Sequence, residues 1–214
     1  MTFLELCNRV RQESGISGSG PLTVINQQAI LAKVVEWVRQ ADLDIQRLQP
    51  TWTFLWRIGS AVMQTDERQY SLLDLGLADT NRIKNMTIGD QPLIEMGWDW
   101  FKRMGYARNT DRHQPTAYTY RPDGILMFFP IPDQDYVIEV ERSILPTQLQ
   151  FDDDVSLIPE RFHDVIMRKA LMYYASHEED NMLLQVATMR YNDSLAELSA
   201  ACLPVMKFAP RGFI

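Results

Sequence analysis

The chain has 214 residues, 46% of them hydrophobic, and a formal net charge of −7. This hydrophobic content is enough for a core and excludes wholesale disorder, and no run approaches the roughly 20 apolar residues of a membrane helix. Acidic residues exceed basic ones by 13 to 9 in residues 58–149 and by 10 to 6 in residues 150–214. A basic face that holds DNA by its phosphates is therefore not expected.

Two helices are expected at the N-terminal end. Thr2 and Glu5 have the spacing of a capping box at the start of the first helix. Residues 15–21 contain three glycines and a proline, which predicts a loop. Apolar residues then recur every three or four positions from about Asn26 to Leu48, which predicts a second helix. Residues 1–13 mix charged and apolar residues, so no secretory signal is expected.

The middle of the chain predicts short strands separated by turns. β-Branched and aromatic residues gather in residues 60–64, 82–88, 92–95, 117–120, 125–129 and 137–141. The clearest hairpin has Arg121-Pro122-Asp123-Gly124 as its turn, because proline sets φ at the second position and glycine supplies a positive φ. Residues 97–104 predict one short helix within this region. Trp98 and Trp100 share no helical face, so at least one of them is expected to be exposed.

The C-terminal part predicts a second pair of helices. A polar linker, residues 151–154, precedes Pro159, which suits the first position of a helix ending near His177. An acidic turn then begins a last helix with an apolar stripe that reaches Leu198. Residues 204–214 contain two prolines and a glycine, so they are expected as an extended C-terminal arm.

These elements predict an α+β fold: mainly a helical bundle of about four helices, with a β-rich domain inserted between helices two and three. Residues 1–57 and 150–203 would form the bundle, because each helix pair exposes an apolar stripe that the other pair can cover. Residues 58–149 would form the β-rich insertion, and residues 204–214 the arm.

No set of catalytic, cofactor-binding or metal-ligating residues emerges from the sequence. Phosphate-binding loops and nucleophile elbows are absent, so an enzyme is not expected. The triplet Asp152-Asp153-Asp154 lacks the alternation and glycine of a calcium loop, so a solvated linker is the preferred interpretation. Cys7 and Cys202 are expected as buried free thiols. The histidines lack metal-ligand spacing, and structural roles are favoured for His163 and His177.

The order of the segments resembles the head-to-tail adaptor proteins of tailed phages, also called head completion or neck proteins, and in particular the tail tubular protein A group. The resemblance covers nearly the whole chain. Three local features carry it: Trp52-Thr53-Phe54 after the second helix, the hairpin that ends in Phe128-Phe129-Pro130-Ile131-Pro132-Asp133, and Ile158-Pro159-Glu160-Arg161-Phe162 before the last helix pair.

This resemblance implies a structural virion protein of the neck, made in the host cytoplasm, that needs no cofactor and binds no membrane. Its copies would form a ring, typically a dodecamer, under the portal protein, and DNA would pass through the ring without specific binding. The β-rich part would meet the next neck or tail component. The arm would bind the portal through Val205, Met206, Lys207, Phe208, Pro210, Arg211, Phe213 and Ile214.

Three alternatives remain open at this point. The arm is apolar and needs cover, and it could find that cover on its own chain instead of on the portal. A phage peptidoglycan hydrolase would need an acid and a partner held together, for which Glu160, Glu178 and Glu179 are the nearest candidates. A DNA-packaging accessory protein would bind nucleic acid, and the acidic balance of the chain speaks against it.

Overall fold

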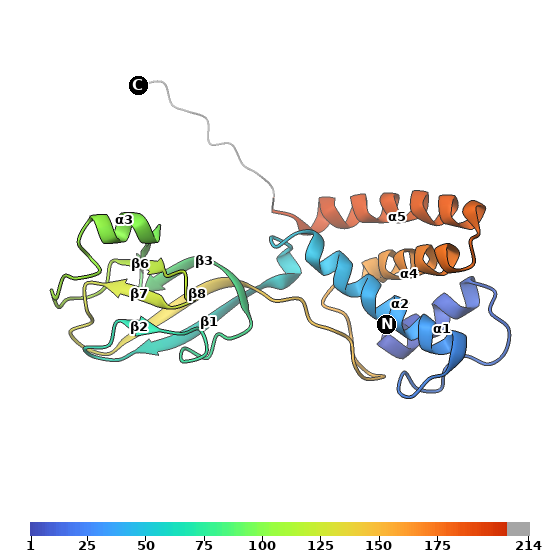
Figure 1. The fold of residues 1–214 in the computed structure, drawn as a ribbon, viewed down its shortest axis with the longest axis horizontal. Helices are drawn as coiled ribbons and strands as arrows, with labels where there is room; N and C mark the ends of the chain where they lie inside the picture. The colour runs from blue at the N-terminus through green and yellow to red at the C-terminus, as the bar shows by residue number, and fades with distance from the viewer. Residues whose placement is uncertain (205–214) are drawn as a thin grey trace, which may run out of the picture. The chain divides into compact units, whose positions relative to one another are not determined.

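The computed structural model describes residues 1–204, which divide into two compact units. One unit combines Met1–Leu55 with the chain from Pro146 onward and is helical (Figure 1). The other is Trp56–Leu145 and contains all the strands. The predicted arm lies outside the described residues from Val205 onward.

The helical unit contains α1 (Phe3–Glu13), α2 (Ala29–Leu48), α4 (His163–His177) and α5 (Asn181–Cys202), with short 3-10 turns at Thr53–Leu55 and Glu160–Phe162. α4 packs against α1, α2 and α5, and α1 also packs against α2. Each helix turns one apolar face inward, as the three- and four-residue spacing of its buried side chains requires. The largest fully buried side chains of this unit are Phe3, Leu6, Ile45, Trp52 and Leu55.

Local signals begin and end these helices. The capping box of Thr2 and Glu5 is confirmed: Glu5 N donates to Thr2 Oγ1 at 3.3 Å, and Thr2 N donates to Glu5 Oε2 at 2.9 Å. Asp180 caps α5 by accepting from Leu183 N at 2.9 Å. The prediction for Pro159 is wrong by one residue, because its extended ψ of 138° keeps it ahead of the first helical turn. α2 begins at Ala29, not near Asn26, whose φ of 56° belongs to the preceding loop.

The strands form two four-stranded sheets. The first has the order β1 (Trp56–Met63), β8 (Tyr136–Ile144), β3 (Thr80–Ile88), β4 (Gln91–Pro92), and all of its pairs are antiparallel. The second has the order β2 (Gln69–Tyr70), β7 (Leu126–Phe129), β6 (Ala117–Tyr120), β5 (Ile94–Met96), with β5 parallel to β6. The expected turn Arg121–Gly124 joins β6 to β7, and Gly124 has a φ of 83°.

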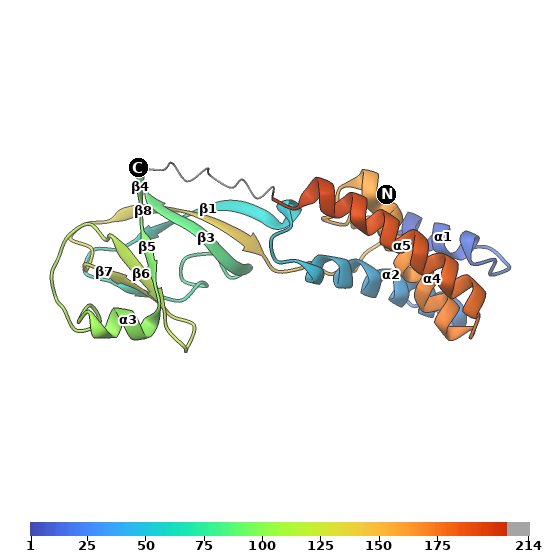
Figure 2. The same ribbon diagram turned by 90° about the horizontal axis from the view of Figure 1, so that it is seen from above.

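The two sheets bury their facing side chains in one apolar cluster. Met86, Ile138 and Val140 from the first sheet meet Leu126 and Phe128 from the second, and all five are fully buried. α3 (Trp98–Arg103) lies against β6, on the side away from β1 and β8 (Figures 1 and 2). This arrangement leaves the outer side of α3 uncovered within the unit.

The expected fold class, a mainly helical bundle with an inserted β-rich domain, is wrong. Among the described residues, five α-helices stand beside two four-stranded sheets, so the sheets are a substantial part of an α+β fold. One of the five helices, α3, lies between strands β5 and β6 in the chain. The error has a physical cause: β3 begins at Thr80 and β8 continues to Ile144, beyond the expected segments 82–88 and 137–141, and the added residues Asn81, Arg142 and Ser143 are neither β-branched nor aromatic. These residues become part of the strands through hydrogen bonds with partner strands that are distant in the sequence.

The expected domain boundaries, 1–57 with 150–203 and 58–149, stay a prediction about independent folding. The compact units divide the chain at Leu55 and Leu145.

Candidate interaction surfaces

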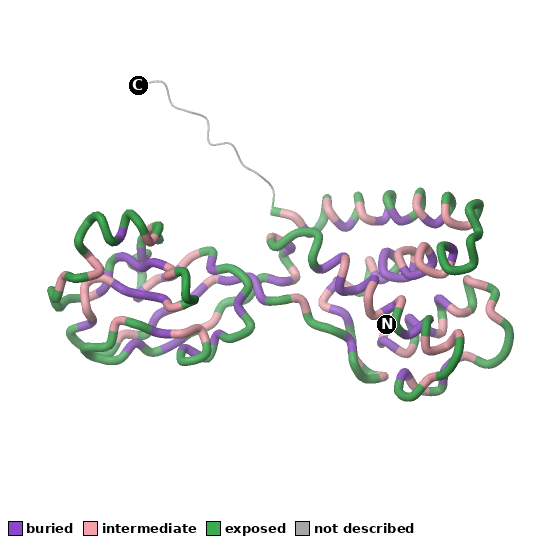
Figure 3. The backbone as a smooth tube through the Cα atoms, viewed as in Figure 1, coloured by how far each residue is buried: buried purple, intermediate pink, exposed green. Residues whose placement is uncertain are grey.

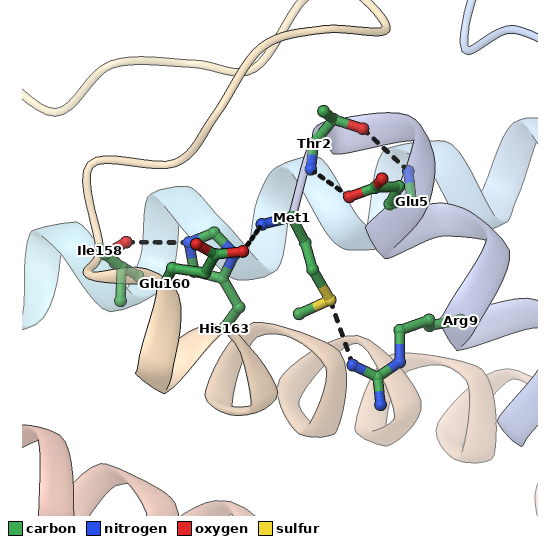
Figure 4. Close-up of polar contacts among 7 residues, drawn as sticks. All are labelled: Met1, Thr2, Glu5, Arg9, Ile158, Glu160 and His163. Atoms are coloured by element: carbon green, nitrogen blue, oxygen red, sulfur yellow. Dashed lines mark hydrogen bonds and ion pairs between the residues drawn. The ribbon is translucent and has the colours of Figure 1, made fainter.

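A set of polar contacts joins the start of α1 to the start of α4 (Figure 4). The amino group of Met1 pairs with Glu160 Oε1 at 2.8 Å, and Arg9 Nη1 lies 3.2 Å from Met1 Sδ. His163 is fully buried and its Nε2 lies 2.9 Å from the Ile158 carbonyl oxygen. The predicted motif around Glu160 therefore fixes two helix starts against each other.

The electrostatics of this cluster do not suit acid catalysis. The hydrogen bond and the positive charge of the Met1 amino group lower the pKa of Glu160, whereas a general acid of a glycoside hydrolase needs a raised one. Burial lowers the pKa of His163, because loss of hydration disfavours the charged form of the ring. The structural role expected for His163 is consistent with this geometry. In the described part of the chain, no group of three or more potential ligands could hold a metal ion.

A strap of residues 146–158 is fastened to α2. Thr147 N donates to Gln46 Oε1 at 3.0 Å, and Gln46 Nε2 donates to the Thr147 carbonyl oxygen at 3.1 Å. Asp42 is fully buried and accepts hydrogen bonds from Ser156 Oγ and from Gln46 Nε2. Loss of hydration raises the pKa of Asp42 to about 6, because those hydrogen bonds offset only part of the cost of burying its charge.

The aspartate triplet of this strap holds two loops together. Asp152 Oδ1 accepts from Val24 N at 2.5 Å and from Thr23 Oγ1 at 3.0 Å. Asp154 Oδ2 accepts from Phe151 N at 2.8 Å and from Gln150 N at 2.6 Å. The aspartate triplet is therefore more than the solvated linker that the sequence predicts, because two of its side chains bind backbone groups of the loops. The spacing in sequence could not show this, because the partners of Asp152 lie about 130 positions away.

These two loops present an acidic patch, defined here as Leu22, Ile25, Phe151, Asp153 and Val155. Its apolar members are uncovered: Leu22 is 91% exposed, Phe151 60% and Val155 58%. Asp153 is exposed and takes no part in the hydrogen bonds of Asp152 and Asp154. The loops that carry the patch are largely exposed in Figure 3. Uncovered apolar side chains of this size gathered at one place are typical of an interaction site.

A second surface of the same unit is an arginine cleft between α1, α4 and α5, with a volume of about 370 Å³. Arg168 Nη1 donates to the Arg190 carbonyl oxygen at 3.0 Å and to Ser194 Oγ, and Arg168 lies 4.0 Å from Asp164. The residues that line the cleft are Arg9, Glu13, Asp164, Met167, Arg168, Leu171, Leu183, Val186, Ala187 and Arg190. The lining of the cleft thus combines three arginines and two acidic residues with apolar side chains.

α5 extends this uncovered surface. The helix is buried on the side that faces α4 and exposed on the other (Figure 3). Met182 and Met189 lie on its exposed side and are 78% and 60% exposed.

In the other unit, α3 carries an aromatic and basic surface. Trp100 is 51% exposed, as the lack of a shared face with Trp98 predicts, and Arg103 lies 5.5 Å from its ring centroid. The Trp98 ring has Lys102 at 5.3 Å and Arg121 at 5.8 Å. Tryptophan and arginine are the residues most enriched among the energetically dominant positions of protein interfaces.

The residues predicted to bind the portal, from Val205 to Ile214, lie outside the described residues, so the geometry does not test them. Pro204, the last described residue, is exposed at the end of α5. No helix within residues 1–204 is long and apolar enough to cross a membrane.

Comparison with known proteins returned one family. The model of the family described as SU10 adaptor protein matches residues 1–203. No curated protein matches the chain. The matched range includes both units and stops before the predicted arm.

Proposed function

We propose that this chain, which belongs to the SU10 adaptor protein family, joins the portal of a phage head to the next neck or tail component. The family describes phage adaptor proteins, so the chain is a structural component of the virion and not an enzyme. An adaptor interacts with other capsid or tail components of the phage.

One observation carries the joining role: each of the two units has its own uncovered interaction surface. The helical unit has the acidic patch and the arginine cleft, and the sheet unit has the aromatic surface of α3. A protein that bridges two components needs at least two separate surfaces of this kind. A protein with one active site would instead gather its exposed functional groups in one cleft.

In the proposed arrangement, copies of the chain form a ring under the portal, a dodecamer as in the adaptors that the sequence resembles. The helical units pack side by side and the channel admits DNA without binding it specifically. The net charge of −7 supports this, because a predominantly acidic protein does not retain a polyanion. The protein is made in the host cytoplasm and becomes part of the virion neck.

The proposal assigns the portal contact to residues 205–214 and the contact with the next component to the surface of α3. Phe208 and Phe213 would be the anchors in the portal, and Lys207 and Arg211 would lie at the rim, where charge tunes partner choice. Trp100 and Arg103 would provide the second contact.

Removal of residues 205–214 tests the proposal. We expect the melting temperature to stay nearly unchanged, because the packed helices end at Cys202, and we expect binding to purified portal to be lost. The matched control is Trp100→Ala, which should still bind portal but should fail to recruit the next component. If truncation unfolds the protein while the surviving fraction still binds portal, the assignment of the arm is wrong.

The ring is tested by sedimentation. The chain alone should be mostly monomeric, because its uncovered surfaces mix charged and apolar groups, as in interfaces that form on a template. Addition of portal should convert it into a single large complex. A stable ring of the chain alone would contradict the expected monomeric state. Failure to bind any portal would contradict the expected assembly on the portal.

A further inference from the structure

Two surfaces of the helical unit carry opposite charge. In the acidic patch, Asp153 is exposed, Asp152 and Asp154 lie beside it, and residues 151–155 include no basic side chain. In the arginine cleft, Arg9, Arg168 and Arg190 outnumber Glu13 and Asp164.

Both surfaces also leave apolar groups in water. The patch exposes Leu22, Phe151 and Val155, and the cleft has Val186 at its edge, 37% exposed, with Met182 and Met189 nearby on α5. Apolar surface of this kind gains roughly 25 cal/mol for each Å² that a partner covers.

From this pairing of charge and apolar surface we infer that the acidic patch of one copy docks into the arginine cleft of a neighbouring copy. Phe151 enters the apolar floor formed by Met167 and Leu171, and Asp153 meets Arg190 at the rim. The inference rests on the proposed function, since it names the contact that joins neighbours in the ring.

The contact is head to tail, because it joins two different surfaces of the same chain. Figure 1 shows the loops that carry the patch at the lower side of the helical unit and α5, which lines the cleft, at its top. Contacts of this kind generate closed rings when the rotation between neighbours closes, whereas a contact of one surface with itself stops at a dimer.

Cysteine trapping tests the contact directly. The native thiols do not interfere, because Cys7 and Cys202 are buried and burial raises the pKa of Cys7 to about 12. Phe151→Cys and Val186→Cys place one thiol in the patch and one in the cleft. Purified full-length chains carrying one or the other substitution are mixed at high concentration and oxidised.

We expect a disulfide-linked dimer in the mixture and none when either variant is oxidised alone. Gln49→Cys, an exposed position of the same unit outside both surfaces, is the matched control and should trap with neither variant. Trapping of Phe151→Cys with itself would show a contact of the patch with its own copy and would overturn the inference. So would the absence of any dimer in the mixture.

A charge exchange tests specificity. Asp153→Arg and Arg190→Asp, each introduced into both trapping chains, should lower the trapped fraction about tenfold, because like charges then meet at the rim. The two substitutions together should restore it. Asp153 is suitable because Asp152 and Asp154 hold the loop. Arg190 is suitable because its contact with Arg168 is made by the backbone carbonyl, which the substitution keeps. Loss without restoration overturns the pairing.

Two further measurements distinguish a contact made by the arm from the proposed docking, and failure of the docking from failure of the adaptor role. If removal of residues 205–214 abolishes trapping, the arm makes the contact between copies and the inference is wrong. Portal binding is measured separately on the same proteins. A chain that binds portal but does not trap refutes the docking and leaves the adaptor role standing, whereas a chain that traps but ignores portal refutes the proposed function and leaves the docking standing.

Discussion

Trp56 and Ser143 are directly paired in the antiparallel ladder of β1 and β8. Neighbouring strands lie about 5 Å apart, so the chain enters the sheet unit and leaves it at adjacent positions. The unit also has its own apolar core between its two sheets. It therefore has the two features of a domain that can be excised: close ends and a self-contained core.

We predict that a fragment of residues 56–145 folds alone. Its near-ultraviolet circular dichroism should show ordered aromatic residues, and its thermal unfolding should be cooperative. A fragment of residues 56–135 is the control, because it lacks β8, which pairs with both β1 and β3 and so joins the first sheet. Absence of a cooperative transition in the longer fragment would show that the two units depend on each other to fold.

Among the residues that bind the strap to α2, Gln46 should be the one whose substitution lowers stability most. Gln46→Ala removes both hydrogen bonds to Thr147 and one of the two side-chain donors of Asp42, which leaves Ser156 as the other, all in a buried site. We expect a loss of about 2–3 kcal/mol in the free energy of unfolding, measured in urea. Arg47→Ala, at the exposed neighbouring position, should change stability by less than about 0.5 kcal/mol. Equal effects of the two substitutions would contradict the role of Gln46.

Asp42 should make stability depend on pH. Its pKa of about 6 in the folded state lies above its ordinary value of 3.8, so the native state holds the proton more tightly. The contribution of Asp42 to stability therefore grows as the pH falls through 6 and is complete below the unfolded value. Relative to an Asp42→Asn variant, the natural protein should gain about 1 kcal/mol between pH 7 and pH 5.

The comparison with the variant is essential, because His163 acts in the opposite direction. Its pKa is lowered by burial, so its contribution to stability is lost as the pH falls through the unfolded histidine value. Both proteins contain His163, and the difference between their unfolding curves isolates Asp42. Parallel pH profiles of the two proteins would refute the assignment.

Arg68 should hold the loop after α3. Its guanidinium group donates to the carbonyl oxygens of Ala107 at 2.8 Å and Asn109 at 2.9 Å. Arg68→Lys keeps the charge but loses the fork of donors, so amide hydrogen exchange in residues 105–111 should accelerate while the apolar core stays protected. Arg108→Lys, at an exposed position of the same loop, is the control and should leave exchange unchanged.

The sequence by itself determined the features that depend on neighbours within a few positions. The capping box at Thr2 and Glu5, the apolar stripe of α2 and the turn Arg121–Gly124 all lie where the pattern predicts them. Each is a matter of local backbone preference or of one helical period, which the order of residues specifies directly. The exposure of at least one of Trp98 and Trp100 followed from the same periodicity, and Trp100 is the exposed one.

The tertiary structure alone decided how far the strands extend and which of them pair. β8 lies between β1 and β3, whose residues come from two other parts of the chain, and this pairing joins three of the four strands of the first sheet. The tertiary structure also brought Asp152 to Val24, and it assembled the arginine cleft from α1, α4 and α5. Such contacts depend on the packing of segments far apart in sequence, so no local pattern encodes them.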